Sequence, residues 1–287
     1  MRFNLTILDP PGYPFTRFLF DVIRLLQGAL ESLGHPCTIS QNTLERGRIN
    51  ILVGLHNVQT PDLVREALTG DHRMVLLQTE IVTGKSFNHV TTDARFEQVF
   101  LPIARRSVAV WDSSVDNQAA LRTHGIEAEI LRFGYDPTLE DIRHKPEKDI
   151  DFFFYGSLTA HRKAVLHKLD ALGYRVAVMF DPPTIYRNDH ISRAEIVLSM
   201  RQSEEMAHLP HGRILYLVNN RCLVVGESGR EQGALEDVFL WSDPEDFIEL
   251  CRETRAREDR REVAMANYER FRSRPMSGFL EPLVAKL

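Results

Sequence analysis

The sequence predicts an α/β protein built from two doubly wound, Rossmann-like domains that face a central cleft, followed by a helical extension. Three observations predict this fold. Apolar runs alternate with amphipathic stretches along the first half of the chain, the same alternation restarts near residue 150, and the segment after Trp241 is charged with a helical pattern. Strands that are apolar throughout are typical of parallel sheets covered on both faces.

In the first half, the apolar runs are expected to form the strands of one parallel sheet. They are FNLTIL, CTI, INILVGL, MVLLQ, VAVW and EILRF. The helices expected between them cover residues 14–33, 61–69, 93–106 and 113–124. Strands separated by helices of this length predict βαβ crossovers.

Residues 136–149, DPTLEDIRHKPEKD, lose the periodicity and become charged, which is typical of an exposed connection between domains. We therefore predict a first domain over residues 1–140 and a second over residues 141–287. In the second domain, the expected strands are IDFFFYG, YRVAVMF, AEIVLSM and RCLVVGE, and the expected helices are HRKAVLHKLDALG and HGRILYLVNN. The sequence SDPED after Trp241 is a typical helix start, so a helical tail completes this domain.

Composition and charge narrow the function classes. Hydrophobic residues make up 43% of the chain and charged residues 26%, as in ordinary globular proteins. A formal charge of -5 removes the overall basic field of a duplex-binding protein, so no nucleic-acid partner is expected. Cys37, Cys222 and Cys251 lie far apart without CxxC spacing, which predicts neither a zinc site nor a disulfide.

No apolar run approaches the ~20 residues of a membrane span, and Asp9, Pro10 and Pro11 interrupt any signal-peptide core. A soluble, cytoplasmic protein is therefore expected. The weakly amphipathic end MSGFLEPLVAKL leaves peripheral membrane contact open, with docking on its own domain as the simpler interpretation.

The second domain contains two basic helix starts. Gly156 is expected to turn the chain tightly after a strand, Ser157 follows it, and Arg162 and Lys163 begin the next helix. Helix-start N–H groups together with a guanidinium suit an anion such as a diphosphate. A lone glycine is not a complete phosphate-binding fingerprint, so a turn glycine with solvated charges stays open.

The second basic helix start lies in HLPHGRILYLVNNRCLVVGES. His208, His211 and Arg213 stand near the start of a short helix, which leads into a strand that ends at Glu227 and Ser228. The carboxyl ends of parallel strands share one edge of a sheet, so both basic helix starts are expected at that edge, where they could clamp one anionic leaving group. Solvated charge is again the alternative for each arginine.

These segments, in the order strand, GSL, arginine-bearing helix, AEIVLSM and PHGRILYLVNNRCLVVGE, resemble the nucleotide-sugar half of GT-B fold glycosyltransferases. The resemblance is to bacterial group 1 and spore-protein-like members and covers residues 149–270, whereas the first half resembles them only by layout. It implies transfer of a sugar from a nucleotide-activated donor to a hydroxyl of a glycan, a lipid-linked compound or another acceptor. It implies that Arg162, Lys163 and Arg213 contact the donor phosphates and that Glu227 and Ser228 lie near the nucleotide or the donor sugar. From their positions beside these residues, Gly156, Ser157, His208 and His211 are added to the predicted donor site.

The chain departs from this family in one respect. The family usually carries two glutamates seven residues apart near this helix, and His208 and Tyr216 stand there instead. A retaining mechanism built on that pair is therefore not supported. Arginine and lysine at helix starts can stabilise a leaving diphosphate, so neither a metal nor another cofactor is expected.

An inverting transfer needs a base from the first half of the chain. Asp9, His56 and Glu80 are the candidates because they follow predicted strands; Asp112 does too, but is expected to cap a helix. A satisfied loop or capping role is the alternative for each. Three other functions also remain open: a nucleotide-sugar epimerase or hydrolase on the same scaffold, a non-catalytic nucleotide-sugar-binding protein, and a transferase acting on DNA bases, which the net acidity disfavours.

Overall fold

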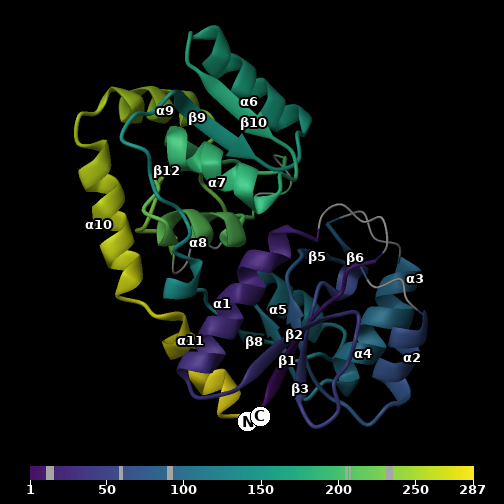
Figure 1. Cartoon of the computed structure of the whole chain (residues 1–287). Helices are drawn as coiled ribbons and strands as arrows, with labels where there is room; N and C mark the ends of the chain where they lie inside the picture. The colour runs from purple at the N-terminus through teal and green to yellow at the C-terminus, as the bar shows by residue number, and fades with distance from the viewer. Residues whose placement is uncertain (11–15, 58–60, 89–92, 204–205, 207, 231–234) are drawn as a thin grey trace. The chain divides into compact units, whose positions relative to one another are not determined.

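The computed structural model describes residues 1–10, 16–57, 61–88, 93–203, 206, 208–230 and 235–287. The chain divides into two compact units: unit 1 comprises Met1–Phe133 and Met276–Leu287, and unit 2 comprises Gly134–Pro275. Each unit holds one large parallel sheet with helices on both of its faces (Figure 1). This confirms the predicted fold class of two doubly wound α/β domains.

The sheet of unit 1 has the strand order β2-β1-β3-β4-β7-β8. Its strands are β1 (Phe3–Ile7), β2 (Cys37–Gln41), β3 (Ile49–Val53), β4 (Arg73–Gln78), β7 (Ala109–Asp112) and β8 (Glu129–Ile130). The other elements are α1 (Phe18–Ser32), η1 (Leu55–Asn57), α2 (Pro61–Thr69), the antiparallel pair β5 (Val82–Thr83) and β6 (Ser86–Phe87), α3 (Asp93–Arg95), the π-helical η2 (Phe96–Phe100), α4 (Leu101–Arg106) and α5 (Val115–Arg122). Every strand predicted from an apolar run in this half is present.

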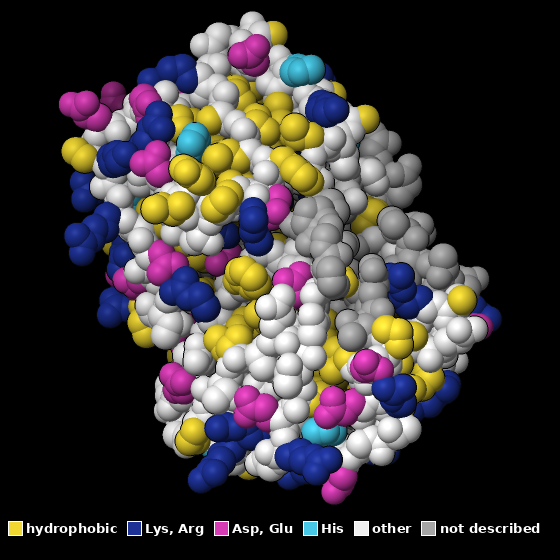
Figure 2. Space-filling view, turned by 45° about the vertical axis from the view of Figure 1, so that its right-hand side comes forward, with side chains coloured by type: hydrophobic (Ala, Val, Ile, Leu, Met, Phe, Trp, Pro, Cys, Tyr) yellow, Lys and Arg dark blue, Asp and Glu magenta, His cyan; other side chains and the backbone are white. Residues whose placement is uncertain are grey.

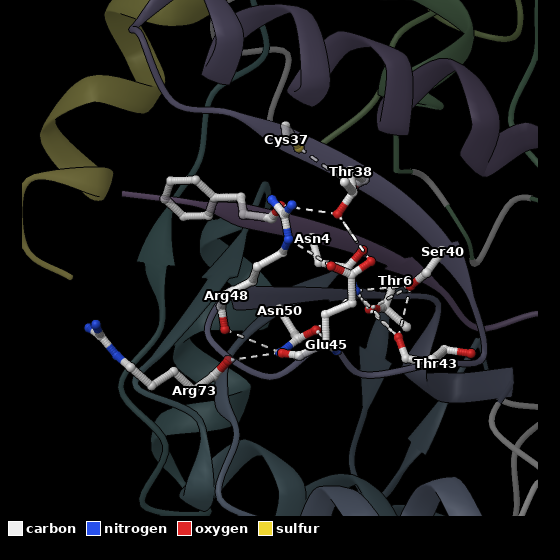
Figure 3. A network of polar contacts seen from close by, with 11 residues as sticks. Asn4, Thr6, Cys37, Thr38, Ser40, Thr43, Glu45, Arg48, Asn50 and Arg73 are labelled. Carbon is white, nitrogen blue, oxygen red and sulfur yellow. Dashed lines mark hydrogen bonds and ion pairs between the residues drawn. The ribbon is translucent and has the colours of Figure 1, made fainter.

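The segment that connects β2 to β3 contains no helix and is held to the sheet by a network of polar side chains (Figure 3). The chain crosses from β2 to β3 through residues 42–48, and β1 lies between these two strands. Asn4 of β1 is fully buried and donates through Nδ2 to Asn50 Oδ1 of β3 and to Ser40 Oγ of β2, both at 2.9 Å. Asn50 in turn bonds both the backbone N–H and the carbonyl of Glu45 in the crossing segment. Because each buried polar group finds a partner, this short crossing can cover the sheet without an apolar stripe.

The sheet of unit 2 has the order β10-β9-β11-β12-β13, with all strands parallel. Its strands are β9 (Ile150–Tyr155), β10 (Val176–Met179), β11 (Ala194–Ser199), β12 (Val224–Glu227) and β13 (Leu240–Ser242). Its helices are η3 (Pro137–Leu139), α6 (Ala160–Ala171), α7 (Thr184–Arg193), α8 (His211–Asn219), α9 (Phe247–Ala256) and α10 (Arg260–Arg272).

Alternating side chains of β9 show how the helices cover both faces. Phe152 and Phe154 belong to a core cluster with side chains of α6 and α9, among them Leu169 and Phe247. The helices α7 and α8 contact the same sheet through β9, β11 and β12. The unit is therefore doubly wound, as the continuous apolar strand IDFFFY predicts.

The charged connection predicted at residues 136–149 is part of unit 2 rather than a free linker. The side chain of Asn219, at the end of α8, accepts from the backbone N–H of Asp136 at 3.1 Å. Asn220 Oδ1 accepts from Asp141 N at 2.8 Å and from Ile142 N at 2.9 Å. These bonds place the boundary at Phe133 and Gly134, earlier than the predicted residue 140.

The helical tail also divides. The helices α9 and α10 stay in unit 2, whereas α11 (Met276–Val284) belongs to unit 1 and lies beside α1 (Figure 1). The side chains of Met276, Leu280 and Leu283 are buried there. The tail predicted for the second domain is therefore divided between the two units. No helix within the described ranges is both long and apolar enough to cross a membrane.

Candidate functional site

The candidate site of unit 2 is built where β9 ends. Gly156 follows β9 directly with φ +136°, a backbone conformation that side-chain-bearing residues rarely adopt. A Cβ atom there would lie 2.6 Å from Nη2 of Arg213. Glycine is therefore required at this position for two reasons: the turn needs a positive φ, and the Arg213 guanidinium approaches too closely for a Cβ atom.

Arg213, in the first turn of α8, carries a buried charge that forms no ion pair with any residue the structure describes. Its guanidinium carbon lies 4.9 Å from the ring centroid of Phe154 and 5.3 Å from that of Tyr155. Its Nε and Nη1 atoms are buried and form no hydrogen bond within the described part of the chain. Burial lowers the pKa of Arg213, against a smaller opposing effect of Tyr155. A buried guanidinium with unused donors is a strong attractor for an anion.

Arg162, in the first turn of α6, lies near Arg213 but its donors are already used. Its Nε donates to the carbonyl of Arg201 at 2.8 Å, and Nη2 donates to the carbonyl of Met200 at 2.9 Å. Its Nη1 donates to the carbonyl and the Oγ of Ser157, at 3.0 and 2.9 Å. Burial, and then the charge of Arg213, lower the pKa of Arg162 to about 9. Arg162 therefore ties the turn after β9 to the loop after β11, and adds positive charge beside Arg213.

Glu227, the last residue of β12, holds two groups in place. Its Oε1 atom lies 2.7 Å from Nε2 of His161, the second residue of α6. Its Oε2 atom accepts from the backbone N–H of Arg201 at 2.7 Å. Both carboxylate oxygens of this fully buried side chain are therefore occupied by protein donors.

The other residues predicted for donor binding lie around this cluster. Lys163 is exposed on α6, and His211 is the first residue of α8. His208 forms an isolated β-bridge with Arg230. Ser228 Oγ donates to Asp243 at 2.5 Å and accepts from Arg201 Nη2 at 2.9 Å.

In unit 1, two of the three predicted base candidates lie together. His56 Nε2 is 3.4 Å from Glu80 Oε1, and both side chains are largely buried, 7% and 15% exposed. Burial raises the pKa of Glu80 to about 7, and a hydrogen bond from Asn88 opposes this shift only in part. Burial, assisted by the charge of Arg95, lowers the pKa of His56. The pair therefore combines a neutral imidazole with a carboxyl group that changes ionisation near neutral pH.

Asp9 and Asp112 have their carboxylates engaged in loop structure. Asp9 accepts from Thr16 Oγ1 at 2.6 Å and from Gln41 Nε2 at 2.8 Å. Asp112 Oδ1 accepts from the backbone N–H of Ser114 at 2.8 Å, and it is Ser114 that caps α5. Asp112 thus supports the helix start without being its cap residue.

Sequence reasoning missed His161 and Arg201. The imidazole of His161 was not singled out because its partner, Glu227, is 66 residues away in the chain. The signal was present in part, since His161 directly precedes Arg162 at the predicted helix start. No cluster of three or more His, Cys, Asp or Glu side chains that could hold a metal ion occurs among the residues described.

Comparison with known proteins gives structural matches only. No protein-family model matches the chain, and no curated protein sequence matches it. AviGT4, a glycosyltransferase involved in avilamycin A biosynthesis, superposes with a TM-score of 0.57 at 15% identity, covering 99% of this chain and 96% of its own. An α-glucosyltransferase in complex with UDP and a 13-mer DNA gives a TM-score of 0.64 at 11% identity, covering 100% and 99%. A Listeria monocytogenes protein provisionally assigned as a UDP-N-acetylglucosamine 2-epimerase gives 0.54 at 8% identity, covering 99% and 95%.

These matches extend over nearly the full length of each chain, at identities that carry information on the fold alone. They agree with the two parallel sheets and the helices on both faces of each sheet. The chain therefore has the GT-B fold of glycosyltransferases, as the resemblance in its second half implied.

Proposed function

We propose that the chain is a glycosyltransferase that moves a sugar from a nucleotide-activated donor to an acceptor hydroxyl. Unit 2 binds the donor diphosphate at the end of β9, without a metal ion. The observation that carries this proposal is Arg213, whose buried Nε and Nη1 have neither a hydrogen-bond partner nor a counterion among the described residues. A binding site that receives a diphosphate there gains charge-assisted hydrogen bonds that the protein itself does not supply.

The chemistry follows from this charge distribution. In the transfer, the bond between the anomeric carbon and the diphosphate oxygen breaks while the acceptor oxygen bonds to that carbon. Negative charge then grows on the departing diphosphate, and cationic groups already in place stabilise it. Arg213 provides direct contacts, and Arg162 adds its charge from a position fixed by Ser157 and Met200.

We assign removal of the acceptor proton to Glu80 of unit 1. A carboxyl group whose pKa is raised to about 7 is well matched to accept a proton at neutral pH. His56, at 3.4 Å, is neutral and can hold the orientation of the Glu80 carboxylate.

The acceptor class is proposed from surface charge. Basic and acidic side chains are intermixed on the face shown in Figure 2, and the formal charge of the chain is -5. This distribution favours a glycan or another weakly charged acceptor over a polyanion, whose binding depends on phosphate contacts by lysine and arginine. DNA therefore serves as a comparison acceptor in the assay, because one solved structure with this fold contains it.

The test is a calorimetric titration of the purified chain with UDP, GDP, dTDP, ADP and CDP in metal-free buffer. We expect one of them to bind, and Arg213→Ala to weaken it about 10- to 100-fold, because a charge-assisted hydrogen-bond pair contributes ~1.5–3 kcal/mol. Arg252→Ala is the matched control, since Arg252 pairs with Glu249 on the exposed surface of α9. Equal affinities of wild type and Arg213→Ala would refute the assignment.

The same preparation separates the alternatives. Incubation with the matching nucleotide sugar and a panel of acceptors should give a glycosylated product. Conversion of the donor to an epimer without acceptor would indicate an epimerase, rapid release of free sugar would indicate a hydrolase, and binding without turnover would indicate a non-catalytic protein.

A further inference from the structure

His161 and Glu227 form a pair that the expected donor contacts do not explain. The imidazole Nε2 lies 2.7 Å from Glu227 Oε1, and the glutamate side chain is completely buried. The other glutamate oxygen is bonded to the backbone N–H of Arg201. Glu227 is therefore fixed by protein donors and orients His161, and it has no oxygen left for a ligand.

The second ring nitrogen of His161 is available. With Nε2 bound to Glu227, Nδ1 forms no hydrogen bond to any residue in the described ranges. The imidazole side chain is 19% exposed, so solvent or a ligand can reach it. His161 is the second residue of α6, and Gly156 and Ser157 form the turn just before that helix. The free nitrogen thus belongs to the same helix start as the proposed diphosphate site.

The charged groups around the His161–Glu227 pair have opposite effects on a further positive charge in this region. Arg162 interacts electrostatically with both Arg213 and Glu227, so two guanidinium groups and one carboxylate share this region. Burial, and then the charge of Glu227, raise the pKa of the Cys251 thiol in α9, so this thiol stays uncharged. Arg201 adds its backbone N–H and a side chain that binds Ser228. Before a ligand binds, the arginines disfavour a further positive charge, and Glu227 favours it.

A diphosphate changes this balance because it brings negative charge to the two arginines. Imidazole is the side chain that gains and loses a proton near neutral pH. We propose that His161 is a proton-linked ligand of the donor diphosphate. On binding, Nδ1 takes up one proton from solvent and donates it as N–H to a phosphate oxygen, while Nε2–H remains on Glu227. The proposal rests on the proposed function of unit 2 and adds a residue whose charge depends on occupancy.

The test measures proton uptake directly. The nucleoside diphosphate that binds best in the panel is titrated into the full chain at pH 7.5, in buffers of different ionisation enthalpy. The slope of observed enthalpy against buffer enthalpy gives the number of protons taken up per nucleotide. We expect an uptake that His161→Gln removes, because glutamine is of similar size and does not titrate. The free nucleotide is ionised identically in both titrations, so a difference in proton uptake arises in the complex, where only the side chain at position 161 has changed.

Two further variants make the interpretation specific. His167→Gln removes an exposed imidazole from the same helix and should leave proton uptake unchanged. Glu227→Gln removes the carboxylate that favours the imidazolium, so it should reduce uptake while His161 is still present. In wild type, affinity should fall as pH rises from 6.5 to 8.5, by at most about tenfold per pH unit, and this fall should be smaller in His161→Gln.

The outcomes separate this inference from the proposed function. If no nucleotide binds the wild-type chain, the proposed donor site is refuted, and the proposed role of His161 is refuted with it. If a nucleotide binds and depends on Arg213, but His161→Gln takes up as many protons as wild type, then only the role of His161 is wrong.

Discussion

The substitution Gly156→Ala tests the geometry of the donor site more sharply than removal of a charge. The backbone of Gly156 has φ +136°, and an added Cβ would lie 2.6 Å from Arg213 Nη2 and 3.5 Å from Phe154 Cζ. The first distance is too short for a real contact, so one of the two groups must move. The guanidinium is the end of a flexible side chain, so Arg213 is the group expected to move.

The expected free-energy cost of Gly156→Ala can be estimated separately for folding and for nucleotide binding. Holding alanine at a positive φ costs about 1–3 kcal/mol of folding free energy. Displacing Arg213 disturbs its contacts with the Phe154 and Tyr155 rings, but Nε and Nη1 have no hydrogen bond to a described residue that could be lost. In the nucleotide complex, however, the displacement forfeits the contacts of Arg213, which contribute ~1.5–3 kcal/mol. We therefore expect nucleotide affinity to fall about 10- to 100-fold.

Gly173→Ala provides the matched control. Gly173 follows α6 with φ +85°, and a Cβ there would meet no atom within 4 Å. This variant should suffer a comparable backbone strain and show a lower melting temperature, with unchanged nucleotide affinity. Any loss of affinity caused by destabilisation alone would appear in both variants.

A double-mutant cycle completes the assay. Affinity is measured by calorimetry for wild type, Gly156→Ala, Arg213→Ala and the double variant. Because the glycine acts through the arginine, Gly156→Ala should have almost no further effect once Arg213 is absent. Additive losses in the double variant, or full affinity in Gly156→Ala, would refute the reasoning.

Three further predictions concern other parts of the chain. Glu80→Gln should lower the transfer rate at least about 100-fold with unchanged donor affinity, and the wild-type rate should rise through pH 7, because the base must be ionised. Because burial raises the pKa of Glu80 to about 7 in the folded chain, its contribution to stability is complete below pH 4.5 and is lost as pH rises through 7. The melting temperature of the wild type should therefore fall over this pH range, and that of Glu80→Gln should not show this fall. Asp151→Asn should cost about 2 kcal/mol in urea unfolding at pH 7, since Arg175 and Arg255 lower the pKa of Asp151. The difference should begin to shrink as pH falls below 3.8 and should vanish only once pH has passed the lowered pKa of the folded chain. Asn50→Ala should cost about 2 kcal/mol and speed amide exchange at Glu45, whose N–H it leaves unpaired; protection equal to wild type would contradict this role.

The sheets were predictable because burial on both faces leaves a direct trace in the sequence. Runs such as FNLTI and INILV are buried at every position, so an apolar run identified these central strands. The helix α7 left no such trace. Of its residues only Arg187, Ile191 and Ser192 are buried, and two of these are polar, so no apolar stripe marks TIYRNDHISR as a helix. The strand β13, with three residues, is too short to show a period.

Unit membership was harder to predict because it depends on contacts between distant residues. The segment 136–149 has the composition of a linker, yet the side chains of Asn219 and Asn220 bond its backbone. The apolar residues of α11 indicate a buried helix, but nothing in their order says that the partner is α1, at the other end of the chain. The apolar periodicity of a helix predicts that one of its faces is buried, but it does not identify the element that buries it.

The two arginines of the donor site show the same limit for function. Arg162 and Arg213 both stand in the first turn of a helix that follows a parallel strand, so sequence reasoning gave them the same role. Their different roles depend on backbone carbonyls that no residue pattern reveals. The carbonyls of Ser157, Met200 and Arg201 surround Arg162 and use its donors. Nε and Nη1 of Arg213 have no hydrogen-bond partner among the described residues, and its guanidinium carbon lies 4.9 Å from the ring centroid of Phe154. Under the proposed function, Arg213 with its unpaired donors would be the main contact of the diphosphate, and Arg162 would add only its charge. The position of Arg213 relative to Gly156 is therefore the decisive quantity to measure.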